Sequence, residues 1–240
     1  MTDTAYSMRH AEVYDTVHAA RGRDWAAEAD EIAALINRQR PGTRSLLDVA
    51  CGTGGHLQRF REQFERVEGL ELSGGMRAVA ARKLPGVTLH GADMRSFRLA
   101  EPVEAITCMC FSICYLSTFD DLCRAVSTMA ANLVPGGVVV VEPWWFPENF
   151  IDGFVTASVA EDAGRVITRM SHSVRAGRQT RMTVRYTVGD ADGIRDFTEQ
   201  EILTLFTEQE YLSAFERAGI AARHQPGPPN GRGLFVGTRT

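Results

Sequence analysis

The feature that most constrains this chain is a short stretch in which an apolar strand runs into glycines and then into a helix. The run Ser45-Leu46-Leu47 leads into Asp48-Val49-Ala50-Cys51-Gly52-Thr53-Gly54-Gly55-His56, and apolar residues at helical spacing follow at 57, 60 and 64. Glycine lets the backbone turn tightly and approach a ligand closely, and the following helix presents unpaired N–H groups there. This layout predicts a doubly wound α/β fold with its ligand at the carboxyl ends of the strands.

The glycine spacing argues against a dinucleotide ligand. A dinucleotide-binding G-x-G-x-x-G would need glycine at position 57, where the chain has Leu57. The sequence D-V-A-C-G-T-G-x-H instead resembles motif I of the Rossmann-like S-adenosylmethionine-dependent methyltransferases. This resemblance implies a class I methyltransferase fold and S-adenosylmethionine as cofactor, bound at the bend of Ala50, Gly52 and Gly54.

Two acidic residues end the next predicted strands. Glu71 and Asp93 lie at the ends of strands predicted over 67–72 and 87–94. An acidic residue about 20 residues after the first strand can accept both hydrogen bonds of a ribose diol. In these methyltransferases an acidic residue after the third strand contacts the adenine amino group, and the next side chain, here Met94, packs on the ring. The alternative is that both carboxylates only cap the helices that follow.

Composition bounds the function classes that need to be considered. The chain has 240 residues, 44% of them hydrophobic and 23% charged, which suits one large core with at most one embedded subdomain. Its net charge of −4 argues against a nucleic-acid partner. No apolar run approaches the ~20 residues that span a bilayer, and the polar N-terminus has no secretory signal. The sequence therefore predicts a cytoplasmic protein with no membrane partner.

The five cysteines do not form a recognisable metal site. Cys108, Cys110 and Cys114 lie close in sequence, but residues 106–111 read as a strand in which alternate side chains share one face. A free cysteine there behaves as a small buried hydrophobe, and no second Cys or His pair with zinc spacing follows. We therefore predict no metal ligands and no disulfide framework.

Helices and strands alternate through the first 141 residues. A helical pattern covers residues 11–39 and ends at Pro41-Gly42, before the first strand. The run Val138–Val141 is fully apolar, which is typical of a buried parallel strand. This alternation predicts a parallel sheet that is covered by helices.

The pattern changes after Trp145. Extended segments separated by turn residues suit an antiparallel sheet, and they cover 165–173, 181–188 and 194–206. A helix over 208–218 and a hairpin over 220–239 then return the chain to the α/β core. We predict a Rossmann-like core of residues 1–146 and 207–240 and an inserted antiparallel sheet over 147–206, which would bind substrate and form the contact of a homodimer.

Arginine is concentrated in the predicted inserted sheet. Between Arg165 and Gly189 there are six arginines and one histidine, His172, but no acidic residue. The planar guanidinium suits bidentate binding of phosphate, but exposed charge also protects edge strands, and spacing alone leaves both open. The donors of Ser171-His172-Ser173 favour a phosphate-bearing substrate.

A closer family resemblance runs nearly from end to end. Its most specific stretches are Ser45–Gly54, Val138–Asn149, Ser171–Arg175 and Gly231–Phe235. They resemble the N,N-dimethyltransferases of TDP-linked 3-amino-deoxysugars in macrolide-type antibiotic pathways, those of desosamine and mycaminose formation. The resemblance implies cofactor contacts at Tyr14, Arg21, Ala50, Glu71, Asp93, Met94 and Met109. For the TDP-amino-deoxysugar it implies contacts at Tyr6, Trp145, Ser171, His172, Arg175 and Arg232.

Tyr115 stands where some relatives have a histidine that is a proposed base. A tyrosine with an unperturbed pKa of about 10 is a poor base at neutral pH. Either Tyr115 positions the amine or water takes the proton, and we favour positioning over a role as a weak base. The expected reaction is an in-line attack of a neutral sugar amine on the sulfonium methyl, in which orientation contributes more than acid–base help.

Three other functions compete with this hypothesis. An O- or N-methyltransferase acting on a non-nucleotide metabolite would share the fold, but the resemblance in 142–175 and 231–235 argues against it. Nucleic-acid amino-methylating enzymes have an Asn/Asp-Pro-Pro-aromatic run where this chain has Phe111-Ser112-Ile113-Cys114. A binding protein without activity is disfavoured because motif I, Glu71 and Asp93 are all present.

Overall fold

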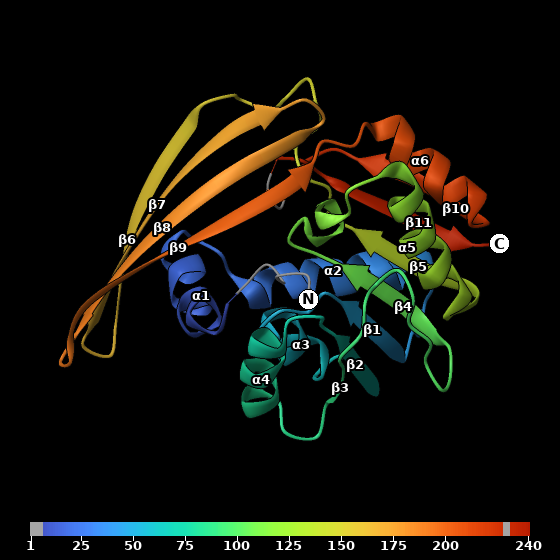
Figure 1. Ribbon diagram of the computed structural model, residues 1–240. Helices are drawn as coiled ribbons and strands as arrows, with labels where there is room; N and C mark the ends of the chain where they lie inside the picture. Colours follow the sequence, from blue (N-terminus) through green and yellow to red (C-terminus); the bar gives the residue numbers. More distant parts are fainter. Residues whose placement is uncertain (1–6, 228–230) are drawn as a thin grey trace.

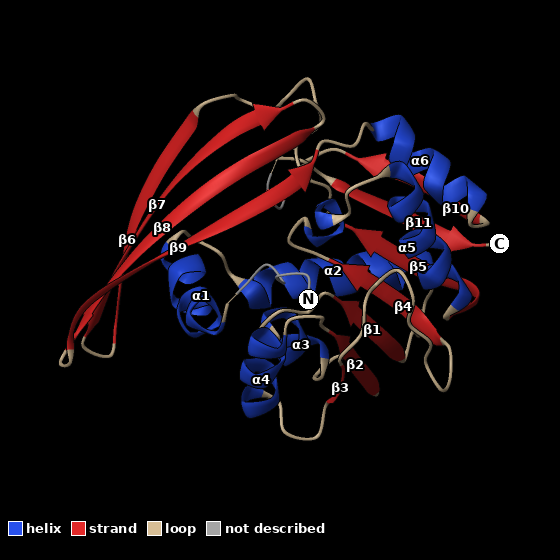
Figure 2. Cartoon of the chain, viewed as in Figure 1, coloured by secondary structure: helices blue, strands red, loops and turns tan. Residues whose placement is uncertain are grey.

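Two β-sheets of different character organise the chain (Figures 1 and 2). The computed structural model describes residues 7–227 and 231–240. The larger sheet has seven strands, β1 (Ser45–Val49), β2 (Arg66–Leu70), β3 (Thr88–His90), β4 (Val103–Cys108), β5 (Leu133–Val141), β10 (Ile220–Gln225) and β11 (Leu234–Arg239). The smaller sheet has four, β6 (Phe154–Asp162), β7 (Arg165–Ala176), β8 (Gln179–Asp190) and β9 (Gly193–Thr204).

The larger sheet has the order β10-β11-β5-β4-β1-β2-β3. Strands β1 to β5 pair in parallel, β11 pairs antiparallel to β5, and β10 pairs antiparallel to β11. The predicted Rossmann-like parallel sheet and its last antiparallel hairpin are therefore confirmed. Because the parallel strands point the same way, their carboxyl ends meet along one edge of the sheet, where this fold binds ligands.

Helices cover both faces of the larger sheet. The helices of the described chain are α1 (Met8–Ala20), α2 (Trp25–Gln39), α3 (Gly55–Phe60), α4 (Gly74–Lys83), α5 (Phe119–Ala131) and α6 (Glu208–Arg217), with a short 3₁₀ helix η1 (Ser112–Tyr115), and all but α1 belong to the layers around this sheet. One apolar cluster packs α5 and α6 against one face, and a second packs α2 against the other. Strand β4 is therefore buried on both sides, as its apolar sequence requires.

The N-terminal helical stretch is two helices, whereas the sequence pattern predicts one. Gly22 adopts a left-handed conformation with φ of 83°, and Asp24 then caps α2 by accepting the N–H groups of Ala26 and Ala27. Because of this break, α1 leaves the larger sheet and packs on the smaller one (Figure 1). Val13 and Val17 make that contact.

The smaller sheet is antiparallel and has a buried inner face. Along β7 the buried residues Ile167, Arg169, Ser171 and Ser173 alternate with exposed ones. Three of its strands are predicted as separate segments, and β6 is an additional one. Among the described helices, none is long and apolar enough to cross a membrane. Within residues 7–227 and 231–240, no group of three or more His, Cys, Asp or Glu residues is arranged to hold a metal ion.

Candidate active site

The glycine bend after β1 is open on its ligand side. Ala50, Gly52 and Gly54 all have positive φ angles of 56°, 57° and 79°. A Cβ atom at Gly52 would meet no atom within 4 Å, so the backbone there is accessible. At Gly54, the N-cap of α3, a Cβ atom would lie 2.5 Å from Cδ1 of Leu84, so the start of α3 packs closely against the end of α4.

Glu71 fixes the bend from the end of the neighbouring strand. Its carboxylate is 8% exposed and accepts the N–H of Gly52 at 2.9 Å and the N–H of Ser73 at 2.7 Å. Burial raises the pKa of Glu71, and these two backbone hydrogen bonds oppose that rise because they favour the charged form. The carboxylate thus joins the glycine bend after β1 to the loop that begins α4.

The other predicted cofactor residues lie along the same edge of the sheet. Asp93 and Met94 follow β3, and Met109 follows β4 and is buried. Asp93 accepts hydrogen bonds from the guanidinium of Arg95, one of them from Nη2 at 2.6 Å. These hydrogen bonds lower the pKa of Asp93. An open glycine bend, a fixed carboxylate beside it and a second acid at the next strand end fit an adenosine-containing ligand.

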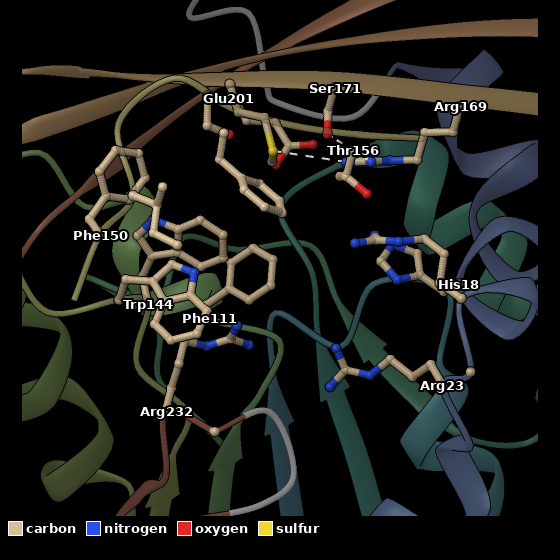
Figure 3. A pocket seen from close by; sticks show the side chains of 18 of the residues that line it. His18, Arg23, Phe111, Trp144, Phe150, Thr156, Arg169, Ser171, Glu201 and Arg232 are labelled. Atoms are coloured by element: carbon tan, nitrogen blue, oxygen red, sulfur yellow. Dashed lines mark hydrogen bonds between the residues drawn. The ribbon is translucent and has the colours of Figure 1, made fainter. Parts of the chain in front are cut away.

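A cavity of about 720 Å³ lies between this edge and the inner face of the smaller sheet (Figure 3). Four parts of the chain line it: the N-terminal segment with Tyr14, Arg21 and Arg23, the loops after β4 and β5, the inner residues of the smaller sheet, and Arg232 with its neighbour before β11. This volume is within the range of sites for small molecules, ~300–1,000 Å³.

The aromatic wall of the cavity surrounds one arginine. The guanidinium carbon of Arg232 lies 5.1, 5.2 and 5.3 Å from the ring centres of Phe111, Trp144 and Trp145. Its Nη2 also forms a 2.6 Å ion pair with Glu142, which is fully buried. In Figure 3, Arg232 lies beneath the cluster of Phe111, Trp144 and Phe150.

Glu142 connects this wall to the N-terminal segment. Besides Arg232, it forms a 3.4 Å ion pair with Arg23, which follows α1. It also accepts the backbone N–H of Cys110 at 2.7 Å. A buried carboxylate with two guanidinium groups and a backbone donor is well compensated, because its charge is paired and hydrogen-bonded. Glu142 therefore ties together three segments that are distant in sequence.

The opposite side of the cavity is cationic. Arg169 is 5% exposed and donates to Oγ of Ser171 at 2.9 Å. Neither Arg169 nor Arg21 forms an ion pair with a described carboxylate within 4.0 Å. Burial, followed by the charge of Arg169, lowers the pKa of Arg21, and burial lowers the pKa of His18 well below its usual value, so that His18 is neutral. This arrangement attracts an anionic ligand.

The structure places two of the predicted substrate residues away from the cavity. Ser171 faces the cavity, whereas His172 is exposed on the outer face of the sheet. Arg175 is exposed at the end of β7, where its guanidinium donates to the carbonyl oxygens of Pro147 and Gly177, both at 3.1 Å. Neither residue lines the cavity. Trp145 and Arg232 do, and Tyr6 lies outside the described residues.

Four charged residues that line the cavity, Arg23, Glu28, Arg169 and Glu201, are not among the ligand contacts predicted from sequence. The signal for Arg169 was available, because it lies two residues before Ser171 in the same strand and so shares its face. Glu201 pairs in register with Met182 of β8, and both side chains line the cavity. Sequence could not place Glu201, because the register between β8 and β9 depends on the turn that joins them.

Comparison with known proteins gives a consistent result. A family model described as a methyltransferase domain matches residues 46–137. The chain is 59% identical over 238 residues to the dTDP-4-amino-2,3,4,6-tetradeoxy-D-glucose N,N-dimethyltransferase of Saccharopolyspora spinosa, covering 99% of this chain and 96% of that protein. It is 50% identical to the dTDP-3-amino-3,4,6-trideoxy-alpha-D-glucopyranose N,N-dimethyltransferase of Streptomyces venezuelae, covering 97% of this chain and 98% of that protein.

Solved structures agree over the full length. The crystal structure of Streptomyces venezuelae DesVI matches with a TM-score of 0.94 and 50% identity, covering 98% of this chain and all of that chain. The structure of SAM-bound CalS10, an amino pentose methyltransferase from Micromonospora echinaspora, matches with a TM-score of 0.88 and 46% identity over the whole of both chains. The chain therefore belongs to the family of S-adenosylmethionine-dependent N,N-dimethyltransferases of dTDP-linked amino sugars.

Proposed function

We propose that this enzyme adds two methyl groups to the C4 amine of a dTDP-linked amino-deoxysugar. The observation that carries the proposal is the cavity, which combines an aromatic wall with buried arginines and is lined by the loops after β4 and β5, at the same edge of the larger sheet as the glycine bend after β1. The choice of C4 rests on the 59% identity to the relative that acts on a 4-amino sugar, against 50% and 49% for two relatives that act on 3-amino sugars.

The cofactor residues of the proposal are those along the edge of the larger sheet. S-adenosylmethionine, when bound, supplies a methyl group on a positively charged sulfonium, which is a good leaving group. Ala50, Gly52 and Gly54 would offer the open backbone, and Glu71 would accept the ribose hydroxyls. The remaining contacts would come from Asp93, Met94 and Met109 at the strand ends and from Tyr14 and Arg21 of the N-terminal segment.

The nucleotide sugar would lie in the cavity against the smaller sheet. Arg232 and Trp145 form its aromatic and cationic wall, and Ser171 with Arg169 presents donors from β7. Phosphate oxygens suit these groups because guanidinium and hydroxyl donors bind them directly. We accordingly treat residues 147–206 as the substrate-binding unit and 1–146 with 207–240 as the methyltransferase core.

The main contribution of the protein would be orientation. A cavity that fixes both the nucleotide and the sugar can hold the amine in line with the methyl group, and well-held geometry can lower a barrier by roughly 7–11 kcal/mol. Two rounds of transfer require that the spent cofactor leaves and that the cavity accepts the monomethyl product. Gly22, at the break between α1 and α2, lines the cavity together with Tyr14 and Arg21 of the N-terminal segment.

Mass spectrometry of products from a panel of acceptors tests this function. We expect the dTDP-4-amino sugar to gain two methyl groups and to react faster than its 3-amino isomer. The free amino sugar should lose about 10²-fold in kcat/KM, because remote binding energy from the nucleotide is used to position the amine. A non-nucleotide amine that reacts as well as the nucleotide sugar would favour the rival assignment, a methyltransferase of small metabolites.

We further propose that the enzyme is a homodimer. The outer face of the smaller sheet exposes six apolar side chains, Val155, Val159, Val166, Met170, Ile194 and Ile202. Apolar patches of this kind in soluble proteins often mark interfaces, and a second copy of the same sheet offers a self-complementary surface. Light scattering at micromolar concentration should give twice the chain mass, and Met170→Glu should shift it toward the monomer. A monomeric wild type would refute the dimer.

A further inference from the structure

Glu201 of β9 is a carboxylate placed in the proposed substrate cavity without a cationic partner. Only two carboxylates, Glu28 and Glu201, are among the described residues that line the cavity. Glu28 is engaged by Arg23 at 2.8 Å and by His56 at 3.0 Å. Glu201 forms no ion pair within 4.0 Å with any described residue, although the residue is buried, with only 6% of its surface exposed. Buried carboxylates are normally paired, so this one is available to a ligand.

Tyr115 orients that carboxylate from behind. Its hydroxyl donates to Oε2 of Glu201 at 3.0 Å, and Tyr115 itself packs against the main apolar core and is not among the cavity residues. Among the described residues, Oε1 of Glu201 has no hydrogen-bond partner. Figure 3 shows Glu201 at the cavity surface with Ser171 and Thr156, across from the side that Arg23 and His18 occupy.

The charged surroundings of Glu201 are mixed. The groups that act on it come from every element packed around it: Tyr115 of η1, Arg169 of β7, Tyr186 of β8, Arg21 at the end of α1, and Glu199 of its own strand. Burial raises the pKa of Glu201, and the Tyr115 hydroxyl and the charge of Arg169 oppose the rise. A carboxylate whose pKa is moved toward neutrality is a better proton acceptor at neutral pH.

We propose that Glu201 binds the ammonium group of the sugar and accepts its proton, and that Tyr115 is a positioning residue that holds the Glu201 carboxylate. This inference rests on the proposed function and assigns the amine subsite within it. Sequence left Tyr115 with a choice between orienting the amine and acting as a weak base. The geometry gives the hydroxyl a third role, because its hydrogen is directed at a carboxylate rather than at the cavity.

The proton and electron balance of the step is complete. The ammonium gives one proton to Oε1 of Glu201, which leaves a neutral amine with a lone pair. That lone pair forms a bond to the methyl carbon while the carbon–sulfur bond breaks and its electrons stay on sulfur. The product is a methylammonium, and Glu201 releases its proton to solvent as the cofactor is exchanged. The second methylation repeats the same transfer from the methylammonium.

Glu201→Gln tests the proposal through the pH dependence of kcat/KM. The amide keeps the shape and can still accept from Tyr115, but it cannot take a proton. Only substrate whose amine is already neutral in solution can then react. We expect a loss of about 10²-fold at neutral pH, in the range of general-base effects, that shrinks to less than tenfold near pH 9. Asp196→Asn, on the exposed outer side of β9, removes a carboxylate far from the cavity and should leave the profile unchanged.

The pH dependence of kcat/KM for Tyr115→Phe provides a second test, which does not depend on whether Glu201→Gln folds. It removes a hydrogen bond to the charged form of Glu201, so the pKa of that carboxyl rises further. Activity on the acidic side depends on the ionised carboxylate, so the acid limb of the profile should move to higher pH with only a threefold to tenfold loss at its maximum. A role limited to packing would lower activity equally at all pH values and leave the limb in place.

The outcomes separate this inference from the function on which it rests. Wild-type enzyme that methylates the dTDP-amino sugar, with Glu201→Gln losing activity in parallel at every pH, would overturn the inference and leave the function standing. The same holds if Glu201→Gln behaves as Asp196→Asn does. Wild-type enzyme that binds S-adenosylmethionine in calorimetry but methylates no member of the panel would overturn the proposed function and this subsite with it.

Discussion

Glu71→Gln is expected to reduce kcat/KM about a thousandfold and to abolish measurable binding of S-adenosylmethionine, with the fold intact. The carboxylate accepts N–H groups from Gly52 and Ser73, one on each oxygen. An amide would turn its own NH₂ group toward one of these donors. Hydrogen bonds to a charged group contribute roughly 1.5–3 kcal/mol each. Losing one bond to the bend and two to a ribose would exceed the ~4 kcal/mol that a thousandfold effect requires.

Calorimetric titration and a matched variant check this prediction. Glu68→Gln removes a carboxylate from β2, the strand that Glu71 follows, where Glu68 pairs with His90 at 2.6 Å and touches neither the bend nor the cavity. It should bind S-adenosylmethionine within twofold of the wild type. If Glu71→Gln and Glu68→Gln bind S-adenosylmethionine with equal affinity, Glu71 does not hold the cofactor and serves only to start α4.

Sequence was most informative about the larger sheet. The apolar run into Asp48 and the fully apolar Val138–Val141 identify central parallel strands, because only buried strands tolerate that composition. Sequence was less informative about the N-terminal helices, because no proline marks the break between α1 and α2. Gly22 lies in a short polar link that the surrounding helical pattern conceals, so the sequence suggests one helix instead of α1 and α2.

The candidate site shows the same division. The bend residues and Glu71 are local features of β1 and β2, and the sequence pattern located them. The cavity is not local, because it forms where β7 and β9 meet the loops after β4 and β5. Period-two alternation separates Ser171 from His172, since adjacent strand residues face opposite ways. No sequence pattern gives the register that brings Glu201 to Tyr115.

The buried carboxylate of Glu142 should dominate the stability of the site. We expect Glu142→Gln to lower the free energy of unfolding by about 3–5 kcal/mol, because removing one partner of a buried ion pair leaves the other charge buried without compensation. Arg232 would lose its ion pair, and Arg23 would keep only its pair with Glu28. In a chain of this size, each kcal/mol corresponds to roughly 2–4 °C, so the melting temperature should fall by about 6–20 °C.

The exposed pair of Arg66 and Glu101 offers the matched control for this effect. Its 3.0 Å separation lies between the 2.6 and 3.4 Å of the two ion pairs of Glu142, but the Glu101 side chain is 79% exposed. Exposed pairs are typically worth about 0–1 kcal/mol because water screens both charges. Thermal melts should therefore separate Glu142→Gln from Glu101→Gln by several degrees, and dTDP affinity should fall only in the former, since Arg232 loses the group that holds it beside Trp144 and Trp145. Equal melting temperatures for the two variants would mean that Glu142 does not hold the three segments together.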